Sequence, residues 1–334
     1  MVGTALIALG GNALSPAGGT GSYDEQCEQA AQMATAIAEV IAKGWRVVIV
    51  HGNGPQVGAL ALQQAFQHER VAGFVPPEPL FSLGAMTQGQ VGSILVMALQ
   101  RHLGGESPIA CVVTHTVVAA DDPAFACPTK PIGPFFSAEE ASALARDRGW
   151  VMVDDAGRGL RRVVPSPVPQ RFLEAAAIRQ LVSHGTLVVA GGGGGVPVIA
   201  SSNGFVGVEA VIDKDLAASS LARSLGADAL ALVTAVPNVE LDFGTPRQRS
   251  LYHLDVGDAE RYLSDGQFPP GSMGPKIEAS ITFLRQGGQV AVITSPERLL
   301  ATLDDDHAPD TNMGTRIEVD LASALTGEEV RWSR

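Results

Sequence analysis

The sequence predicts an α/β protein in which helices cover both faces of a parallel central sheet. Two observations carry this prediction: short apolar runs alternate with amphipathic stretches, and the runs are apolar almost throughout. Such strands are typical of parallel sheets that are buried on both faces. The six runs are residues 4–9, 46–50, 109–114, 186–190, 228–234 and 289–293. In such sheets ligands bind beyond the carboxyl ends of the strands, so residues just after each run are functional candidates.

The stretches between these runs predict the helices. We expect helices near residues 25–43, 55–68, 84–103, 171–183, 214–225 and 274–286. Residues 79–100 carry no charged side chain and are long enough to span a bilayer. The polar residues Thr87, Gln88, Gln90 and Ser93 instead favour a helix buried in the protein, and no membrane contact is expected.

Residues 120–169 interrupt the alternation of strands and helices. This segment holds seven prolines and no clear pattern of either element. A loop-rich insertion of this length in a compact domain is usually functional or disordered, so we expect an excursion from the sheet, or lid, rather than another strand–helix unit. A second boundary near residue 206 predicts two lobes, 1–206 and 207–334.

Composition excludes several classes of partner. The 334-residue chain is 46% hydrophobic and carries a formal net charge of −12, so a diffuse basic surface for nucleic acid or an anionic membrane is not expected. An anionic ligand would have to be bound by a few placed groups. Cys27, Cys111 and Cys127 are odd in number and lack CxxC spacing, which favours neither a disulfide framework nor a zinc site and indicates a cytoplasmic location.

Four glycine-rich turns follow predicted strands. They are Gly10–Gly11–Asn12, Gly52–Asn53–Gly54, the run from Gly191 to Gly195, and residues 270–274. A single turn of this kind is most simply a tight turn. Four at one edge of a sheet favour an anion-binding cradle, because glycine lets backbone N–H groups approach a ligand closely.

Other phosphate-binding patterns are absent from the sequence. The chain has no GxxxxGK[ST] motif, and no GxGxxG follows a strand with a suitable acidic residue downstream. Asp242–Phe243–Gly244 spells DFG, but the other protein-kinase motifs are missing, so we interpret it as a chance match. Neither a P-loop enzyme nor a protein kinase is indicated.

The chain has only four lysines, and three of them lie in unusual contexts. Lys130 stands between prolines, Lys214 lies between two aspartates, and Lys276 follows the turn at 270–274. Lys43 ends a predicted helix, where a structural role suffices. An ammonium group is a compact charge that suits phosphoryl oxygens. From the local sequence, Asp215 could orient a lysine, position a nucleophile or cap the helix that follows.

The histidines show no metal-binding spacing. Neither HxH nor HExxH occurs, so no protein-built metal site is expected. His51 alone stands out, because it opens one of the glycine-rich turns.

Taken together, the motifs resemble the carbamate kinases of the amino acid kinase family. The matching segments follow the family order and span nearly the whole chain. They are LGGNAL (9–14), HGNGPQVG (51–58), AMTQGQVG (85–92), PTKPIGPF (128–135), DDAGRGLRRVVPSPVP (154–169), GGGGGVPV (191–198), GVEAVIDKDLA (207–217), PGSMGPKIEA (270–279) and GTRI (314–317). The segments around Lys130, Lys214 and Lys276 are the most specific, because related kinases lack the PTKPIG insertion.

The resemblance implies the amino acid kinase fold, an open αβα sandwich with a mostly parallel central sheet, in which residues 120–169 would form a protruding subdomain over the active site. It also implies a reversible phosphoryl transfer between ATP and carbamate, often from carbamoyl phosphate to ADP. The N-terminal lobe would bind carbamate or carbamoyl phosphate, and the C-terminal lobe would bind ATP or ADP. Mg²⁺ would be held mainly by phosphates and water, with no metal ligand from the protein. A cytoplasmic homodimer is expected.

The resemblance also implies roles for individual residues. Lys130 would reach carbamoyl phosphate from the lid, Lys214 and Lys276 would stabilise the transferred phosphoryl group, and Asp215 would orient the lysines. No protein base is required, because carbamate is already anionic. The expected substrate- and phosphate-binding residues, several of them acting through backbone N–H groups, are Gly10, Gly11, Asn12, Gly52, Asn53, Gly54, Gly193 and Gly194. The expected nucleotide-binding residues are Thr234, Met273, Gly274 and Lys276.

Residues 235–245 depart from the family pattern, in which an aspartate is usual near Pro237. This segment borders the nucleotide in the family, so two alternatives stay open. One is a sibling kinase that acts on another small carboxylate, and the other is a nucleotide-binding regulator that has lost catalysis. The metabolic pathway and the physiological direction of the reaction are not determined by the sequence.

Overall fold

The computed structural model describes residues 3–11, 19, 21–70, 76–155, 159–269, 271–304 and 313–319. Its centre is an eight-stranded sheet in which every pair of neighbouring strands is parallel except β16 and β17. All six predicted strands belong to it, so the mostly parallel central sheet is confirmed. Its strands, in spatial order, are β15 (His253–Asp255), β17 (Thr315–Glu318), β16 (Val290–Thr294), β12 (Ala229–Val233), β1 (Thr4–Leu9), β2 (Arg46–His51), β9 (Leu187–Val189) and β3 (Ile109–Cys111).

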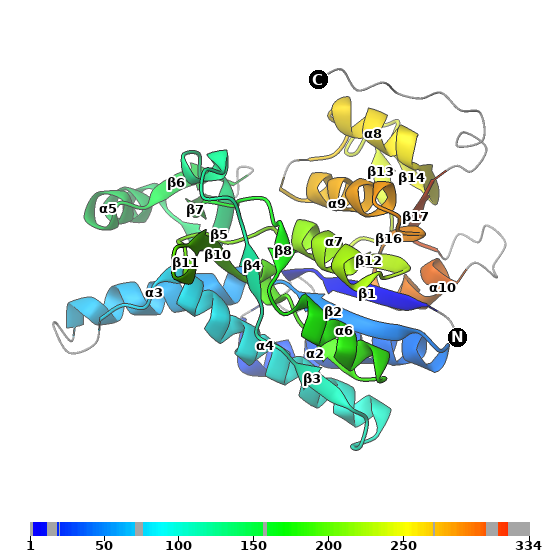
Figure 1. The fold of residues 1–334 in the computed structure, drawn as a ribbon. Helices are drawn as coiled ribbons and strands as arrows, with labels where there is room; N and C mark the ends of the chain where they lie inside the picture. The colour runs from blue at the N-terminus through cyan, green and yellow to red at the C-terminus, as the bar shows by residue number, and fades with distance from the viewer. Residues whose placement is uncertain are drawn as a thin grey trace.

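Helices cover both faces of this sheet (Figure 1). One layer contains α2 (Tyr23–Ala42), α4 (Leu80–Leu103) and α10 (Leu299–Leu303). The other contains α6 (Ala175–Ser183), α7 (Lys214–Leu225), α8 (Val256–Ser264) and α9 (Met273–Arg285). The αβα sandwich predicted from the sequence is therefore confirmed.

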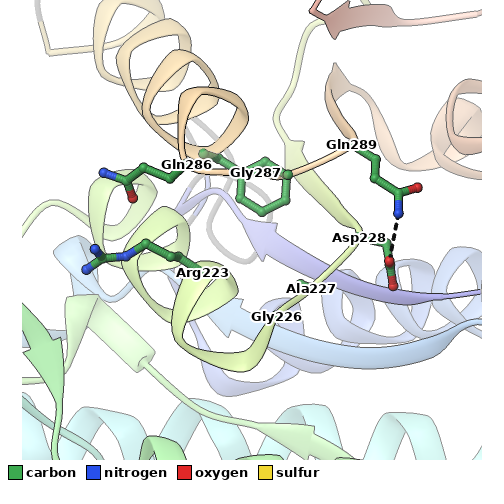
Figure 2. Close-up of a pocket in the computed structure, with 9 residues that line it drawn as sticks. Arg223, Gly226, Ala227, Asp228, Gln286, Gly287 and Gln289 are labelled. Atoms are coloured by element: carbon green, nitrogen blue, oxygen red, sulfur yellow. Dashed lines mark hydrogen bonds between the residues drawn. The ribbon is translucent and has the colours of Figure 1, made fainter.

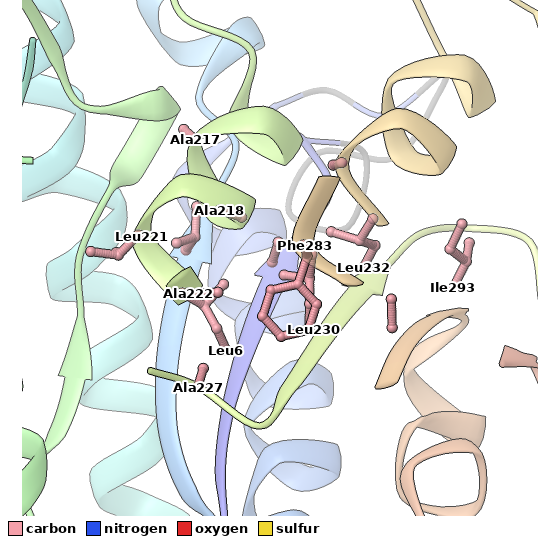
Figure 3. Packing of buried hydrophobic residues seen from close by; sticks show 14 of the residues in the cluster. Leu6, Ala217, Ala218, Leu221, Ala222, Ala227, Leu230, Leu232, Phe283 and Ile293 are labelled. Carbon is pink, nitrogen blue, oxygen red and sulfur yellow. The ribbon is translucent and has the colours of Figure 1, made fainter. Parts of the chain in front are cut away.

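The alternation of side chains along β1 shows how one strand serves both layers. Leu6 and Ala8 belong to the core under α7 and α9, whereas Ile7 and Leu9 belong to the core under α2 and α4. Successive side chains in a strand point to opposite faces, so a strand between two helical layers must be apolar at every position. Figure 3 shows Leu6 beside Leu221, Leu230 and Phe283 in the first of these cores.

A second, four-stranded sheet was not predicted. Its order is β11 (Gly204–Gly207), β10 (Val196–Ser201), β4 (His115–Val117) and β8 (Arg171–Phe172). The predicted helix at 171–183 is therefore wrong at its start, because residues 171–172 pair with β4 and α6 begins only at Ala175. Likewise β3 ends at Cys111, and residues 112–114 lead into β4.

The protruding subdomain contains regular secondary structure. Its antiparallel sheet has the order β5 (Lys130–Phe136), β7 (Leu160–Val164) and β6 (Val151–Asp154), and α5 (Ala138–Arg148) connects β5 to β6. The protrusion is confirmed (Figure 1), whereas the expectation of a loop-rich segment is wrong. Two of its prolines, Pro131 and Pro134, lie in β5, an edge strand, where a missing N–H is tolerated.

A contact between two glycines helps to seat the lid on helix α3 (Gly54–Arg70). A Cβ atom added to Gly58 would lie 2.0 Å from the Cα atom of Gly133, which has a φ of +74° in β5. Around this contact Ile132 and Val164 of the lid pack with Val57 of α3 and with Val211. The lid therefore has a small core of its own against the rest of the molecule.

Helix α4 is the one helix in the described ranges that is long and apolar enough to cross a membrane by length and composition. Buried core helices pass the same test. Ile94, Leu95 and Leu99 of α4 are buried in the core that α2 shares with the central sheet. This packing agrees with the interpretation of a helix buried in the protein.

We expect the substitution Gly58→Ala to lower the free energy of unfolding by about 1–3 kcal/mol, because the added methyl group overpacks a backbone contact. Gly84→Ala in α4 is a matched control, since an added Cβ there meets nothing within 4 Å. The control should be neutral or stabilising by up to about 1 kcal/mol, the helix-propensity gain of alanine over glycine. Urea denaturation measures both values. Equal stability of the two variants would contradict the close docking of the lid.

Candidate active site

Helices α7 and α9 carry two lysines that share one buried carboxylate. The Nζ atom of Lys214, the first residue of α7, donates to Oδ1 of Asp215 at 2.5 Å. The Nζ atom of Lys276, in the first turn of α9, donates to Oδ2 of the same carboxylate at 3.1 Å. Asp215 is only 3% exposed. Each of its two carboxylate oxygens accepts from a different ammonium group, and the two lysines are far apart in the sequence.

The cap of helix α7 is Asp213. Its Oδ1 accepts hydrogen bonds from the backbone N–H groups of Asp215 at 2.9 Å and Leu216 at 3.3 Å. Because Asp213 satisfies these donors, the side chain of Asp215 is not the cap. Of the three roles open to Asp215 from the sequence, the geometry supports orientation of the lysines.

Charge pairing outweighs burial at Asp215. Burial by itself raises the pKa of this carboxyl, but Lys214 and Lys276 hold it well below its ordinary value. Burial lowers the pKa of the Lys214 ammonium, and Asp215 opposes that shift. Asp215 is therefore an anion at neutral pH.

The lid brings a third lysine to the same place. Lys130 begins β5, and its Nζ atom forms an ion pair with Oδ2 of Asp213. Asp213, which Lys130 contacts, is two residues before Asp215, the carboxylate that Lys214 and Lys276 share. Lys43, by contrast, caps the end of α2 and pairs with Asp304 at 3.3 Å, outside this cluster.

The turns after β1 and β2 lie against the lysine cluster. A Cβ atom on Gly52 would lie 2.7 Å from the backbone nitrogen of Gly11 and 3.4 Å from Cδ of Lys214. A larger residue at position 52 would therefore displace either Gly11 or Lys214. This close approach explains why glycine is needed there.

Two of the expected backbone donors are already engaged. The N–H of Gly10 donates to the carbonyl of Val233, and the N–H of Gly52 donates to the carbonyl of Leu9, both at 3.0 Å. Both bonds extend the parallel ladder beyond the strand ends. In this structure both N–H groups are thus bonded within the ladder, and the predicted binding of a phosphoryl group by Gly10 and Gly52 stays a prediction. Asn12, a further predicted site residue, lies outside the described residues.

Asn53 lies between helix α4 and the glycine run. Its buried side chain donates from Nδ2 to Oγ1 of Thr87 at 2.8 Å. A Cβ atom on Gly193 would lie 2.1 Å from Nδ2 of Asn53, and Gly193 has a φ of +62°. Gly54 follows as the first residue of α3. The predicted residues Asn53, Gly54 and Gly193 are thus neighbours in space.

Gly194 has a structural part in the same turn. Its N–H donates to the carbonyl of Gly191 at 2.9 Å, and its carbonyl accepts a hydrogen bond from Oγ1 of Thr116 at 2.7 Å. Its N–H is therefore engaged in the turn, and the predicted part of Gly194 in substrate or phosphate binding stays a prediction.

The structure adds two residues that sequence reasoning left without a role. The two residues are Gln88 and Thr114. Oε1 of Gln88 accepts hydrogen bonds from both the backbone N–H and the hydroxyl of Thr114, each at 3.0 Å. The Thr114 hydroxyl in turn accepts from the N–H of Gly191 at 3.1 Å. Buried polar networks of this kind hold a turn in one conformation. The polar run in α4 was the signal available in the sequence.

His51 packs against the glycine run at residues 191–195. Its Nδ1 lies 3.0 Å from the carbonyl oxygen of Gly52, and a Cβ atom on Gly192 would lie 2.4 Å from its Nε2. Burial lowers the pKa of His51 to about 4, so the ring is neutral at physiological pH. A neutral ring with a proton on Nδ1 donates to Gly52.

The predicted nucleotide-binding residues follow β12 or begin α9, at the same edge of the central sheet as the lysine cluster. Thr234 directly follows β12, and its N–H donates to the carbonyl of Thr294 at 2.8 Å. Met273 begins α9, and the N–H of Gly274 donates to the carbonyl of Pro269 at 3.0 Å. Met273 and Gly274 thus lie in the first turn of α9 with Lys276, Thr234 lies at the end of β12, and their binding of a nucleotide stays a prediction.

The divergent segment after β12 forms a hairpin. Its strands are β13 (Val239–Leu241) and β14 (Arg249–Leu251), and Asp242 between them has a φ of +51°. Phe243 at the tip is 66% exposed. Pro237 precedes Asn238, whose buried amide donates to the carbonyls of Leu251 and Met313.

A shallow pocket of about 120 Å³ lies away from this cluster. Figure 2 shows it at the C-terminal ends of α7 and α9, where Arg223, Asp228, Gln286 and Gln289 line it. The lysine cluster lies at the opposite, N-terminal ends of the same helices. This pocket is therefore separate from the candidate active site.

Comparison with known proteins agrees with this arrangement. A model of the amino acid kinase family matches residues 3–295. The chain belongs to the amino acid kinase family. Within the family, a carbamate kinase from Pyrococcus horikoshii is 46% identical over 302 residues, which cover 90% of this chain and 96% of that protein.

Solved structures of the family show the same fold. A carbamate kinase from Giardia lamblia bound to citric acid is 38% identical, with a TM-score of 0.86 and coverage of 95% of this chain and 99% of the other. The Giardia enzyme bound to AMP-PNP is 39% identical, with a TM-score of 0.83 and the same coverage. This amino acid kinase therefore shares both sequence and fold with carbamate kinases along nearly its whole length.

The low pKa of His51 predicts a pH-dependent stability. Between pH 6.5 and about 4 the unfolded chain binds a proton at this histidine and the folded chain does not, so stability falls as the pH falls. The loss amounts to at most about 3 kcal/mol. The amide of asparagine can replace the donor to Gly52. His51→Asn should therefore make the melting temperature less dependent on pH across this range.

His184→Asn, at an exposed histidine, is the matched control and should keep the slope of the unmodified chain. Melting temperatures at pH 4.5, 5.5 and 6.5 give the comparison. An unchanged slope in His51→Asn would show that another group causes the loss.

Proposed function

We propose that the chain is a carbamate kinase, which transfers a phosphoryl group reversibly between ATP and carbamate. The observation that carries this proposal is the cluster in which Asp215 holds Lys214 and Lys276 while the lid supplies Lys130. The carbamate kinases of Pyrococcus horikoshii and Giardia lamblia, which are similar to this chain over nearly its whole length, support the proposal.

The cluster suits the electrostatic demand of phosphoryl transfer. The transferred group passes through an in-line transition state with negative charge spread over its oxygens, so catalysis depends on positioning and neutralisation. Three ammonium groups stand against the two carboxylates of Asp213 and Asp215, which leaves a net positive charge where the phosphoryl group would lie. Asp215 would act as the organiser, because both of its oxygens are bound to lysines.

A protein base is not needed in either direction. The attacking oxygen of carbamate, or of the terminal phosphate of ADP, is already anionic. Asp215 would be a poor proton acceptor, since its pKa is held low by two lysines. The chemistry of the cluster therefore fits a phosphotransferase better than an acid–base catalyst.

The two sides of the cluster would bind different substrates. Gly11, Asn53, Gly54 and Gly193 border the lobe at 1–206, where carbamate or carbamoyl phosphate would bind. Thr234, Met273 and Gly274, with Lys276, border the lobe at 207–334, where ATP or ADP would bind. The AMP-PNP complex of the Giardia enzyme supports a nucleotide substrate.

Three further parts of the proposal concern the setting of the reaction. Mg²⁺ would arrive with the nucleotide and neutralise phosphate charge, with phosphates and water as its main ligands. A homodimer is expected, and the uncharged outer side chains of α4, such as Met86, Ser93 and Met97, offer a surface for it. A cytoplasmic location agrees with three free cysteines.

The decisive experiment is formation of ATP from carbamoyl phosphate and ADP in the presence of Mg²⁺, followed by a coupled assay. We expect turnover by the unmodified chain and a loss of at least about 100-fold in kcat for Lys214→Ala. Lys43→Ala, at a lysine outside the cluster, should retain full activity.

Other outcomes separate the alternatives. Activity with a different acyl phosphate and none with carbamoyl phosphate would indicate a sibling kinase. Nucleotide binding without turnover of any acyl phosphate would indicate a regulator.

Lys130→Ala should affect one substrate selectively. Because Lys130 reaches the cluster from the lid, its loss should raise the KM for carbamoyl phosphate by about 10-fold or more, the effect of one lost charge-assisted contact. The KM for ADP should change by less than about twofold. Initial rates with each substrate varied in turn give both values, and equal losses would contradict the role of the lid.

A further inference from the structure

The segment that leads into α7 runs beneath the lid. The N–H of Val211 donates to the carbonyl of Pro165 at 2.9 Å, just beyond β7. Glu209 accepts a hydrogen bond at Oε1 from the N–H of Leu80, the first residue of α4, at 2.8 Å. Residues 209–213 are thus bound to the lid and to α4 before the chain enters the helix that carries Lys214 and Asp215.

Asp213, at the end of this segment, makes two kinds of contact with one carboxylate. Its Oδ1 caps α7 through the N–H groups of Asp215 and Leu216, while its Oδ2 binds the ammonium of Lys130. The side chain of Asp213 is 14% exposed and that of Lys130 is 28% exposed. One carboxylate therefore connects the lid to the first turn of α7.

The geometry leaves Lys130 able to bind a further anion. An ammonium group has three N–H donors, and Asp213 occupies one of its directions. Burial opposes ionisation of Asp213, but Lys130 reverses the effect and leaves the pKa of this carboxyl below its ordinary value. Asp213 is consequently an anion at neutral pH.

We propose that Asp213 is a positioning residue: it holds the ammonium of Lys130 over the start of α7, so that the docked lid and the Lys214–Asp215–Lys276 cluster keep a set spacing. Lys130 then presents its remaining donors to the acyl phosphate. Asp213 would touch no reacting atom and would act only through Lys130. This inference rests on the proposed carbamate kinase activity.

Asp213→Asn tests the role of the charge. Asparagine is as good a helix N-cap as aspartate, so the substitution keeps the cap and removes the ion pair. We expect the KM for carbamoyl phosphate to rise by about 3- to 10-fold, a typical cost of one charged contact, with little change in the KM for ADP. Asp304→Asn, which removes the Lys43–Asp304 pair elsewhere, should change neither value.

The decisive comparison repeats Asp213→Asn in the Lys130→Ala background. If Asp213 acts through Lys130, the substitution should there change the KM by less than about twofold, because coupled residues are not additive. Equal effects in both backgrounds would overturn the proposal and leave Asp213 as a helix cap. A lower KM in Asp213→Asn would also overturn it, since Asp213 would then compete with the substrate for Lys130.

A second measurement is independent of activity. Amide hydrogen exchange in β5 of the substrate-free protein should be faster in Asp213→Asn than in the unmodified chain or in Asp304→Asn. Unchanged exchange would overturn the proposal even if the kinetics were too slow to measure. Absence of ATP formation by the unmodified chain, together with faster exchange in Asp213→Asn, would instead refute the proposed function and leave the connection of the lid to α7 in place.

Discussion

The buried carboxylate of Asp215 is the constraint on which the candidate site depends. An unpaired carboxylate with 3% exposure would be costly, and two ammonium groups from α7 and α9 compensate for its burial. Because these groups come from two helices, the N-termini of α7 and α9 must lie together at one edge of the sheet. The glycine at position 52 then leaves room for the stem of Lys214.

The lid adds a second charged pair to this arrangement. Gly58 and Gly133 bring its backbone against α3, and Asp213 connects Lys130 to the first turn of α7. The positions of all three lysines thus depend on two aspartates that are two residues apart. A segment far along the sequence therefore becomes part of the same site as the glycine-rich turns.

Much of the central fold followed from local sequence. The six apolar runs became strands of the central sheet, because a strand buried on both faces must be apolar throughout. The shorter strands β4, β8 and β13 escaped prediction, since two or three residues carry no periodicity and pair only through tertiary contacts. The lid was misjudged as loop-rich because the prolines of β5 are tolerated on an edge strand, which the sequence alone does not identify.

The sequence by itself determined which residues are available for the chemistry: three lysines in distinctive contexts, and glycines directly after buried strands. Only the tertiary structure decided how they are used. It made Asp213 the helix cap and Asp215 the partner of both lysines, and it engaged the N–H groups of Gly10 and Gly52 in the strand ladder. The physical reason is that contacts such as Lys276 with Asp215 and Gly10 with Val233 join residues far apart in the sequence, and no local pattern encodes such partners.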